Sequence, residues 1–253
     1  MVMNLASAYW EKMVDMIPEF GKFSNYVNSI LVDDVIGVSV KKIKNLEVII
    51  EYTDTASQRF KQILFALDNL RDIEKNIPTH LNLDEEYEIA FKTDYHFFTF
   101  ITSVASFLNS LAWLTKLIYN IKVSKPQDVD FRRNKRLLKK IRTKNPSLYN
   151  FIFKNLNDWI EEVCNFRDVL LHRREIKLIG ADDRKLYMPV HPEILTYADT
   201  NFESEEKHER YTNEISRKKG GITQPLIPFC EDIVKKVVNF SKGICNSLIN
   251  EIT

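Results

Sequence analysis

Arg167 and His172 are the residues whose types and spacing best suit chemistry in this chain. The polar residue Asp168 follows the arginine directly, and three apolar residues precede the histidine. Histidine can move protons near neutral pH, and the planar guanidinium of arginine binds phosphate oxygens in pairs. The combination favours chemistry on a phosphate group, with the imidazole as general acid or base.

A single helix over residues 145–174 should carry this pair. Asn145 is a favourable N-cap, and Pro146 suits the first helical position, where a backbone N–H has no partner in the helix. Arg167 lies about 40° from Val163 on the helical wheel, so its charge points among apolar side chains and needs a carboxylate, a phosphate or a wet cleft. The apolar stripe that should face a core consists of Leu148, Ile152, Leu156, Trp159, Ile160, Val163, Phe166 and Leu170.

The run from Arg167 to His172 resembles the Arg-x4–6-His signature of HEPN domains, in which a polar residue often follows the arginine. Those domains are all-helical, and many are metal-independent ribonucleases or toxin–antitoxin components that work as dimers. The resemblance implies that His172 acts as general acid or base on an RNA 2′-hydroxyl and that Arg167 holds the scissile phosphate. Asp168 would orient a neighbouring group. The resemblance also implies a homodimer, and no metal or other cofactor.

Helical geometry leaves a structural role open for the same residues. Five residues along an ideal helix rotate by about 500°, so Arg167 and His172 point about 140° apart. Asp168 and His172 are four residues apart and are therefore neighbours. In this alternative Asp168 pairs with His172 at the surface, and Arg167 is a buried cation held by Glu86 or Asp94.

A basic segment lies immediately before the motif helix. Residues 132–144 contain eight positive charges and no negative charge. They are either the solvated face of a short helix or a surface that binds phosphates, because clusters of Lys and Arg supply the salt-dependent part of nucleic-acid affinity. The candidate RNA-binding residues are Arg132, Arg133, Lys135, Arg136, Lys139, Lys140, Arg173 and Arg174.

Composition narrows the class of protein. Hydrophobic residues make up 44% of the chain and charged residues 28%, with six glycines, which favours a soluble helical protein. The net charge of +1 gives no attraction of the whole chain to nucleic acid, so an anionic partner requires a local patch. The three cysteines are an odd number without CxxC spacing, and the N-terminus lacks the pattern of a secretory signal. We therefore expect a cytoplasmic protein.

The expected fold is mainly α, a HEPN-like helical bundle with a small β-hairpin elaboration. We divide it into an N-terminal helical extension over residues 1–45 and a HEPN-like domain over 46–253. Residues 20–42 leave helix and strand open, and a turn at 180–183 predicts a hairpin between 175–179 and 185–190. Other helices are expected over 4–17, 46–77, 84–122 and 228–252.

The expected helix over 84–122 contains nineteen uncharged residues, 97–115, which is long enough to span a membrane. Hydroxyl and amide side chains dilute this stretch, so we expect the central helix of a bundle and no membrane partner.

The leading function is RNA binding or metal-independent RNA cleavage by an Arg/His pair at a dimer cleft. An antitoxin or another protein partner would also fit the resemblance. The alternative is a non-catalytic interaction or scaffolding module, in which the basic segment binds an acidic partner.

Overall fold

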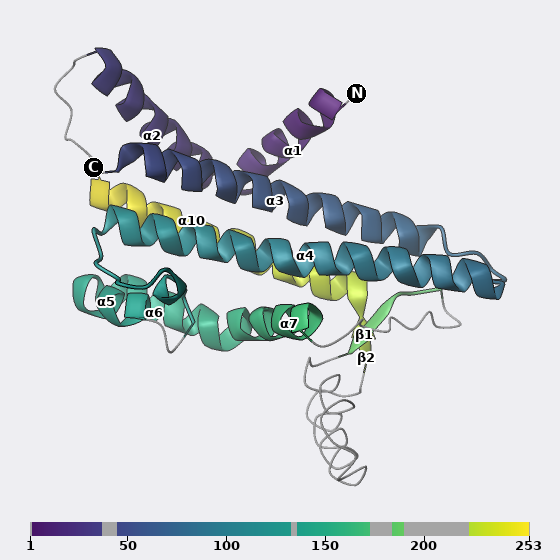
Figure 1. Cartoon of the computed structure of the whole chain (residues 1–253). Coiled ribbons are helices and arrows are strands. Elements are labelled where there is room, and N and C mark those ends of the chain that lie inside the picture. The colour runs from purple at the N-terminus through teal and green to yellow at the C-terminus, as the bar shows by residue number, and fades with distance from the viewer. Residues whose placement is uncertain (1, 37–44, 133–135, 173–183, 190–222, 253) are drawn as a thin grey trace, which may run out of the picture. The chain divides into compact units, whose positions relative to one another are not determined.

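The computed structural model describes residues 2–36, 45–132, 136–172, 184–189 and 223–252 (Figure 1). These residues form a mainly helical structure with a small antiparallel sheet, which confirms the expected mainly α fold with a small β element. The HEPN-like character of the bundle stays a prediction. The elements in chain order are α1 (Val2–Met16), α2 (Pro18–Ile36), α3 (Leu46–Lys75), α4 (Leu83–Ile118), the 3-10 helix η1 (Pro126–Asp128), α5 (Arg136–Lys144), α6 (Pro146–Asn155), the π-helix η2 (Leu156–Ile160), α7 (Glu161–His172), β1 (Tyr187–Pro189), β2 (Thr223–Pro225) and α10 (Leu226–Ile252).

The chain divides into two compact units, and the boundary between them falls within α3, α4 and α10 and after the first residue of α7. The first unit comprises residues 1–62, 103–161 and 235–253, and the second comprises 63–102 and 162–234. The expected boundary near residue 45 stays a prediction.

Aromatic rings from several segments converge on Phe240 of α10 in the first unit. Phe151 stacks on Phe240 with ring centroids 5.5 Å apart, and Phe131 and Trp159 meet it edge-on at 5.6 and 6.1 Å. The indole N–H of Trp159 donates a hydrogen bond to Asn155 Oδ1 at 3.0 Å, so the ring is buried without losing its polar contact. These contacts join α10, the motif helix and the segment before α5 in one core.

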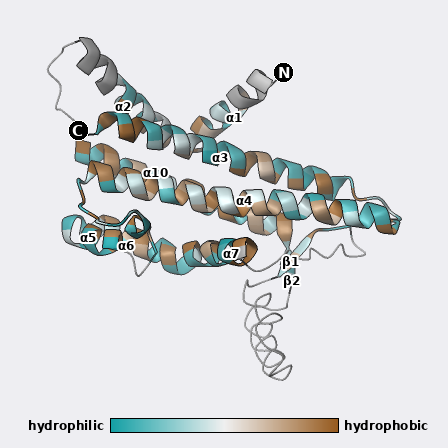
Figure 2. Ribbon diagram, viewed as in Figure 1, coloured by the Kyte–Doolittle hydropathy of each residue, from teal (hydrophilic) through white to brown (hydrophobic). Residues whose placement is uncertain are grey.

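A second aromatic cluster forms the core of the other unit. Phe97 of α4 lies 6.3 Å from Phe166 of α7 and 6.5 Å from Phe229 of α10, and Phe166 and Phe229 are 5.6 Å apart. Figure 2 shows that hydrophobic and hydrophilic residues are mixed along α4 and α10, as expected of helices that bury one apolar stripe.

The small sheet belongs to the second unit. β1 pairs antiparallel with β2, with Tyr187 opposite Pro225, Met188 opposite Gln224 and Pro189 opposite Thr223. The strand expected within 185–190 is therefore present, with its partner much later in the chain. Residues 175–179 and the turn at 180–183, which were expected to complete a hairpin, lie outside the described residues.

Local hydrogen bonds set both ends of α4. At its start Asn82 Oδ1 accepts the Glu85 N–H at 2.9 Å and Glu85 Oε2 accepts the Asn82 N–H at 3.0 Å, which is a capping box. The helix ends at Ile118 rather than at 122 because Asn120 adopts a left-handed conformation, with φ of 47°. The Ile121 N–H then donates to the Lys116 carbonyl at 2.8 Å, as in a Schellman motif.

The segment that the sequence left open between helix and strand is helical as far as Ile36, within α2. Residues 37–44 lie outside the part of the chain that the structure describes. Pro18 begins α2, as its fixed φ allows at a first helical position.

By length and composition α4 could cross a membrane, and 67% of its most apolar window is buried inside the structure. A core helix of a soluble protein passes the same test.

Candidate nucleic-acid interface

The turn that ends α4 places residues 121–124 beside α5. Arg136 Nη1, at the start of α5, donates a hydrogen bond to Ser124 Oγ at 3.0 Å. Lys144, at the end of α5, donates from Nζ to the Tyr119 carbonyl. The left-handed residue Asn120 therefore directs a short loop along the basic helix that the sequence predicted.

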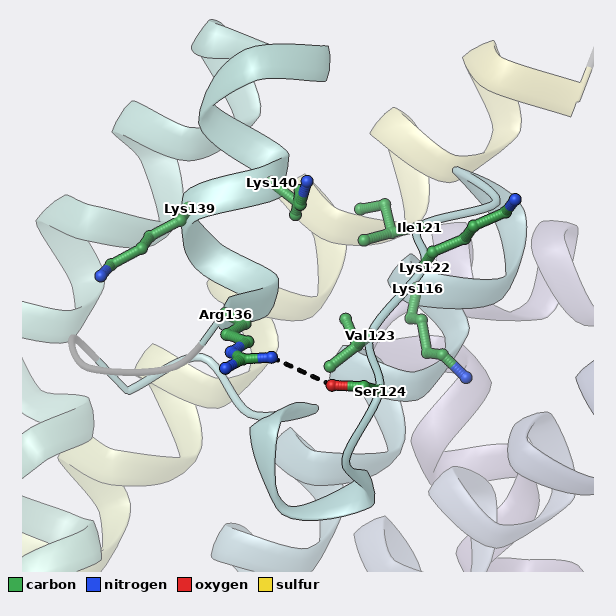
Figure 3. Close-up of a pocket in the computed structure, with 8 residues that line it drawn as sticks. All are labelled: Lys116, Ile121, Lys122, Val123, Ser124, Arg136, Lys139 and Lys140. Atoms are coloured by element: carbon green, nitrogen blue, oxygen red, sulfur yellow. Dashed lines mark hydrogen bonds between the residues drawn. The ribbon is translucent and has the colours of Figure 1, made fainter.

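A pocket of about 600 Å³ opens between α4, this loop and α5 (Figure 3). Five of its lining residues are positively charged, and none is negatively charged. Its volume falls within the range of roughly 300–1,000 Å³ that is usual for ligand sites. The lining residues, which we call the basic pocket, are Lys116, Ile121, Lys122, Val123, Ser124, Arg136, Lys139 and Lys140.

The charged side chains take two different positions around the basic pocket. Figure 3 shows Arg136 reaching toward Ser124, whereas the ammonium groups of Lys116, Lys122 and Lys139 point away from that pair. A small anion beside the bonded pair of Arg136 and Ser124 could accept hydrogen bonds from the guanidinium and from the hydroxyl group. A longer polyanion that passes over the opening would also meet lysines on several sides.

Carboxylates near the basic pocket neutralise only part of its charge. Asp128 Oδ2 lies 3.5 Å from Arg136 Nε. Asp130 accepts hydrogen bonds from Arg132, at 2.8 Å from Nε and 2.9 Å from the backbone N–H. Arg132 is therefore bound to an acid and does not line the basic pocket, although the sequence suggested it as a phosphate ligand.

The structure brings together three of the predicted RNA-binding residues, Arg136, Lys139 and Lys140. It adds Lys116, from the last turn of α4, and Lys122, which follows the turn at Asn120. The sequence analysis missed both because they precede the basic segment and only the tertiary structure places them beside α5. The signal that could have found them is their place in the sequence, since they are the first basic residues after the uncharged stretch over residues 97–115. Apart from Arg132, the other predicted residues lie outside the described residues: Arg133, Lys135, Arg173 and Arg174.

The predicted start of the motif helix is confirmed. Asn145 Oδ1 accepts the Leu148 N–H at 2.9 Å, and Pro146 occupies the first turn. Asn145 Nδ2 also donates to the Tyr119 hydroxyl at 3.0 Å, and that hydroxyl lies 2.8 Å from Ser247 Oγ of α10. This network ties the start of the motif helix to the turn after α4 and to α10.

A π-helical turn divides the motif helix, so α6, η2 and α7 follow one another without a loop. Within it, the Glu161 N–H donates to the Leu156 carbonyl, five residues back. The predicted stripe is buried from Leu148 to Phe166, whereas Leu170 is half-buried and Val169 is buried beside it.

Arg167 lies at the edge of the stripe, with 23% of its side chain exposed. Its Nε donates to Asp168 Oδ1 at 2.9 Å, and its Nη2 donates to the same oxygen. The carboxylate that the structure gives it is therefore the adjacent residue, itself 43% exposed, and not Glu86 or Asp94. Both bonds use the same oxygen, and within the described ranges Nη1 of Arg167 makes no hydrogen bond.

His172 is the last residue of α7, and its side chain lies outside what the structure describes. The proposed pairing of Asp168 with His172 and the proposed sharing of a substrate by Arg167 and His172 both stay predictions.

The cysteines lie in the core. Burial raises the pKa of the Cys230 thiol and of the Cys245 thiol, so both stay protonated and unreactive near neutral pH. No group of three His, Cys, Asp or Glu suited to a metal ion occurs within the described ranges.

No protein-family model, curated protein or solved structure matches this chain. Its function has to be inferred from its own residues.

Proposed function

We propose that this protein binds RNA through the basic pocket and cleaves it without a metal ion at the Arg167–His172 motif. The observation that carries the proposal is the basic pocket, with five cations and no carboxylate among its lining residues. The whole chain has a net charge of only +1, so this is a local concentration of charge. Such a patch binds a phosphate backbone by releasing its counterions.

RNA is favoured over other polyanions by the resemblance of the motif to HEPN ribonucleases. By this resemblance, Arg167 would contact the scissile phosphate and His172 would transfer a proton. The 23% exposure of Arg167 supports this role, as does its Nη1 group, which makes no hydrogen bond within the described part of the chain. The guanidinium can stay bound to Asp168 while it donates to a phosphate oxygen.

The reaction needs only RNA and the two side chains. The 2′-hydroxyl loses its proton to a base and attacks the adjacent phosphorus, and the bond to the 5′-oxygen of the next nucleotide breaks as that oxygen gains a proton. The products are a 2′,3′-cyclic phosphate and a 5′-hydroxyl end. Arg167 would stabilise the charge that develops on the phosphate. A homodimer, as the resemblance implies, would supply a second copy of the motif.

The test is to incubate labelled single-stranded RNA with the purified protein in EDTA. We expect cleavage products that end in a cyclic phosphate. Cleavage should fall by about 100-fold or more in Arg167→Ala and in His172→Ala, which is the usual contribution of a phosphate-binding group or a general acid–base. Asn165→Ala is the matched control, because Asn165 is exposed on the same helix, and it should cleave like the unmodified protein.

Two outcomes would overturn parts of the proposal. Binding without cleavage would refute the ribonuclease activity and leave an RNA-binding protein. If no RNA binds even at low salt, both parts are refuted, and the non-catalytic module with an acidic protein partner is favoured. Arg167→Ala should then chiefly lower the melting temperature.

A further inference from the structure

Five large side chains form an exposed row along the first half of α4. Their steps of four, four, four and three residues place them on one ridge of the helix. Leu83, Tyr87 and Phe91 are 72%, 74% and 73% exposed, and Tyr95 and Phe98 are 60% and 36% exposed. We call these five residues the α4 ridge. On a helix otherwise used to bury aromatic rings, such a row marks an interaction surface.

The ridge continues onto α3 within the same unit. The ring of His96 lies 5.2 Å from Tyr95 and 6.4 Å from Phe65, and Phe65 is itself 46% exposed. At roughly 200 Å² for each large side chain, the exposed parts of the ridge and Phe65 amount to about 700 Å². A standard interface buries about 600 to 1,000 Å² on each partner, so the area of the patch falls within the range of stable dimers.

The spacing of the ridge makes it complementary to itself. If two copies pack antiparallel about a two-fold axis at Phe91, Tyr87 of one copy faces Tyr95 of the other, and Leu83 faces the region of Phe98. Such an arrangement uses the same patch on both subunits, as a closed dimer requires. Ridges with steps of four residues pack into one another at a crossing angle of about 50°.

The charges beside the ridge favour this arrangement. Asp84, Glu85 and Glu86 form an acidic first turn, and Lys92 is bound to Glu88 by an ion pair. Antiparallel packing separates the two acidic turns by about 18 Å along the helix, well beyond the screening length of about 8 Å at physiological salt. A parallel dimer would bring them together. An anionic membrane surface would be repelled by the same carboxylates.

We infer that the α4 ridge binds a second copy of this chain in an antiparallel dimer centred on Phe91. The inference does not depend on RNA binding or cleavage, because none of its residues belongs to the basic pocket or to the motif.

The test is the oligomeric state in solution, measured by sedimentation over a range of protein concentrations. The unmodified protein should dimerise, and Phe91→Asp should weaken dimerisation by about 30-fold or more, as at a central interface residue. The melting temperature of the monomer should not change, since Phe91 is 73% exposed. Phe153→Asp, at an exposed aromatic residue of α6, is the control and should still dimerise.

A charge exchange tests the antiparallel register. Tyr87→Lys alone should weaken the dimer, and Tyr87→Lys combined with Tyr95→Asp should restore it by forming two new ion pairs across the axis. A monomer at high concentration, or a dimer that Phe91→Asp does not affect, would overturn the inference. So would binding to neutral lipid vesicles that Phe91→Asp abolishes, because that result would assign the ridge to a membrane.

Discussion

Neutralising two lysines of the basic pocket should lower the salt dependence of RNA binding by a definite amount. Each phosphate of a single strand that a protein neutralises contributes about 0.7 to the slope of log affinity against log salt. The five cations of the basic pocket therefore set an upper slope of about 3.5, and Lys139→Gln with Lys140→Gln should reduce it by about 1.4. Between 50 and 200 mM salt, the affinity should fall about 100-fold for the unmodified protein and about 20-fold for the variant.

The measurement is fluorescence anisotropy of a labelled single-stranded RNA in EDTA, with His172→Ala in every protein so that no RNA is cleaved. Lys139 and Lys140 are exposed, so their replacement should leave the melting temperature unchanged. Lys22→Gln with Lys235→Gln is the matched control. It changes the net charge equally, at exposed residues of the same unit that do not line the basic pocket.

Two results would refute the reasoning. If both double variants reduce the slope equally, RNA responds to overall charge and not to the basic pocket. If the slope of the Lys139 and Lys140 variant does not change, these lysines do not contact the phosphate backbone.

Three further predictions concern stability. Gly243→Ala should destabilise the protein by about 1–3 kcal/mol in urea, because an added Cβ would lie 2.3 Å from Cζ of Phe151. In a Phe151→Ala background the same change should stabilise it by up to about 1 kcal/mol, through helix propensity, and an equal loss in both backgrounds would contradict this account. Asn145→Ala should lower the free energy of unfolding by about 1 kcal/mol, because the Leu148 N–H loses its acceptor. Asn145→Asp keeps an acceptor and should recover most of this stability, as thermal unfolding of both variants can show. Burial lowers the pKa of His96, so the folded state favours the neutral imidazole. The stability that depends on neutral His96 should be fully present above pH 6.5 and should fall as the pH drops toward the folded-state pKa. His96→Gln should reduce this loss, as the free energy of unfolding measured at pH 7.5 and at pH 5.5 can show.

The sequence predicted the motif helix well because its signals are local. The cap at Asn145 depends on residues three positions apart, and the buried stripe depends on a period of three to four residues. The π-helical turn was not predicted, since a bulge changes the hydrogen-bond partner of a few residues without disturbing that pattern.

The candidate site was predicted only in part, for a related reason. The run of positive charge in α5 is visible in the sequence, but the partners of each charge are not. Arg132 is bound to Asp130, whereas Lys116 joins the basic pocket from α4 and Lys122 joins it from the loop that follows α4. Arg167 is bound to the neighbouring Asp168, although the helical wheel suggested a carboxylate on another helix.

The sequence by itself determined the helices, their caps and the places where charge accumulates, since these depend on residues within a few positions of one another. Only the tertiary structure decided that α4, the loop after it and α5 line one basic pocket, and that β1 pairs with β2. It also decided that the aromatic row from Tyr87 to Phe98 faces solvent, while Phe97 and Phe100 of the same helix are buried. The physical reason is that these outcomes depend on contacts between segments far apart in the chain, and local periodicity does not specify which faces meet.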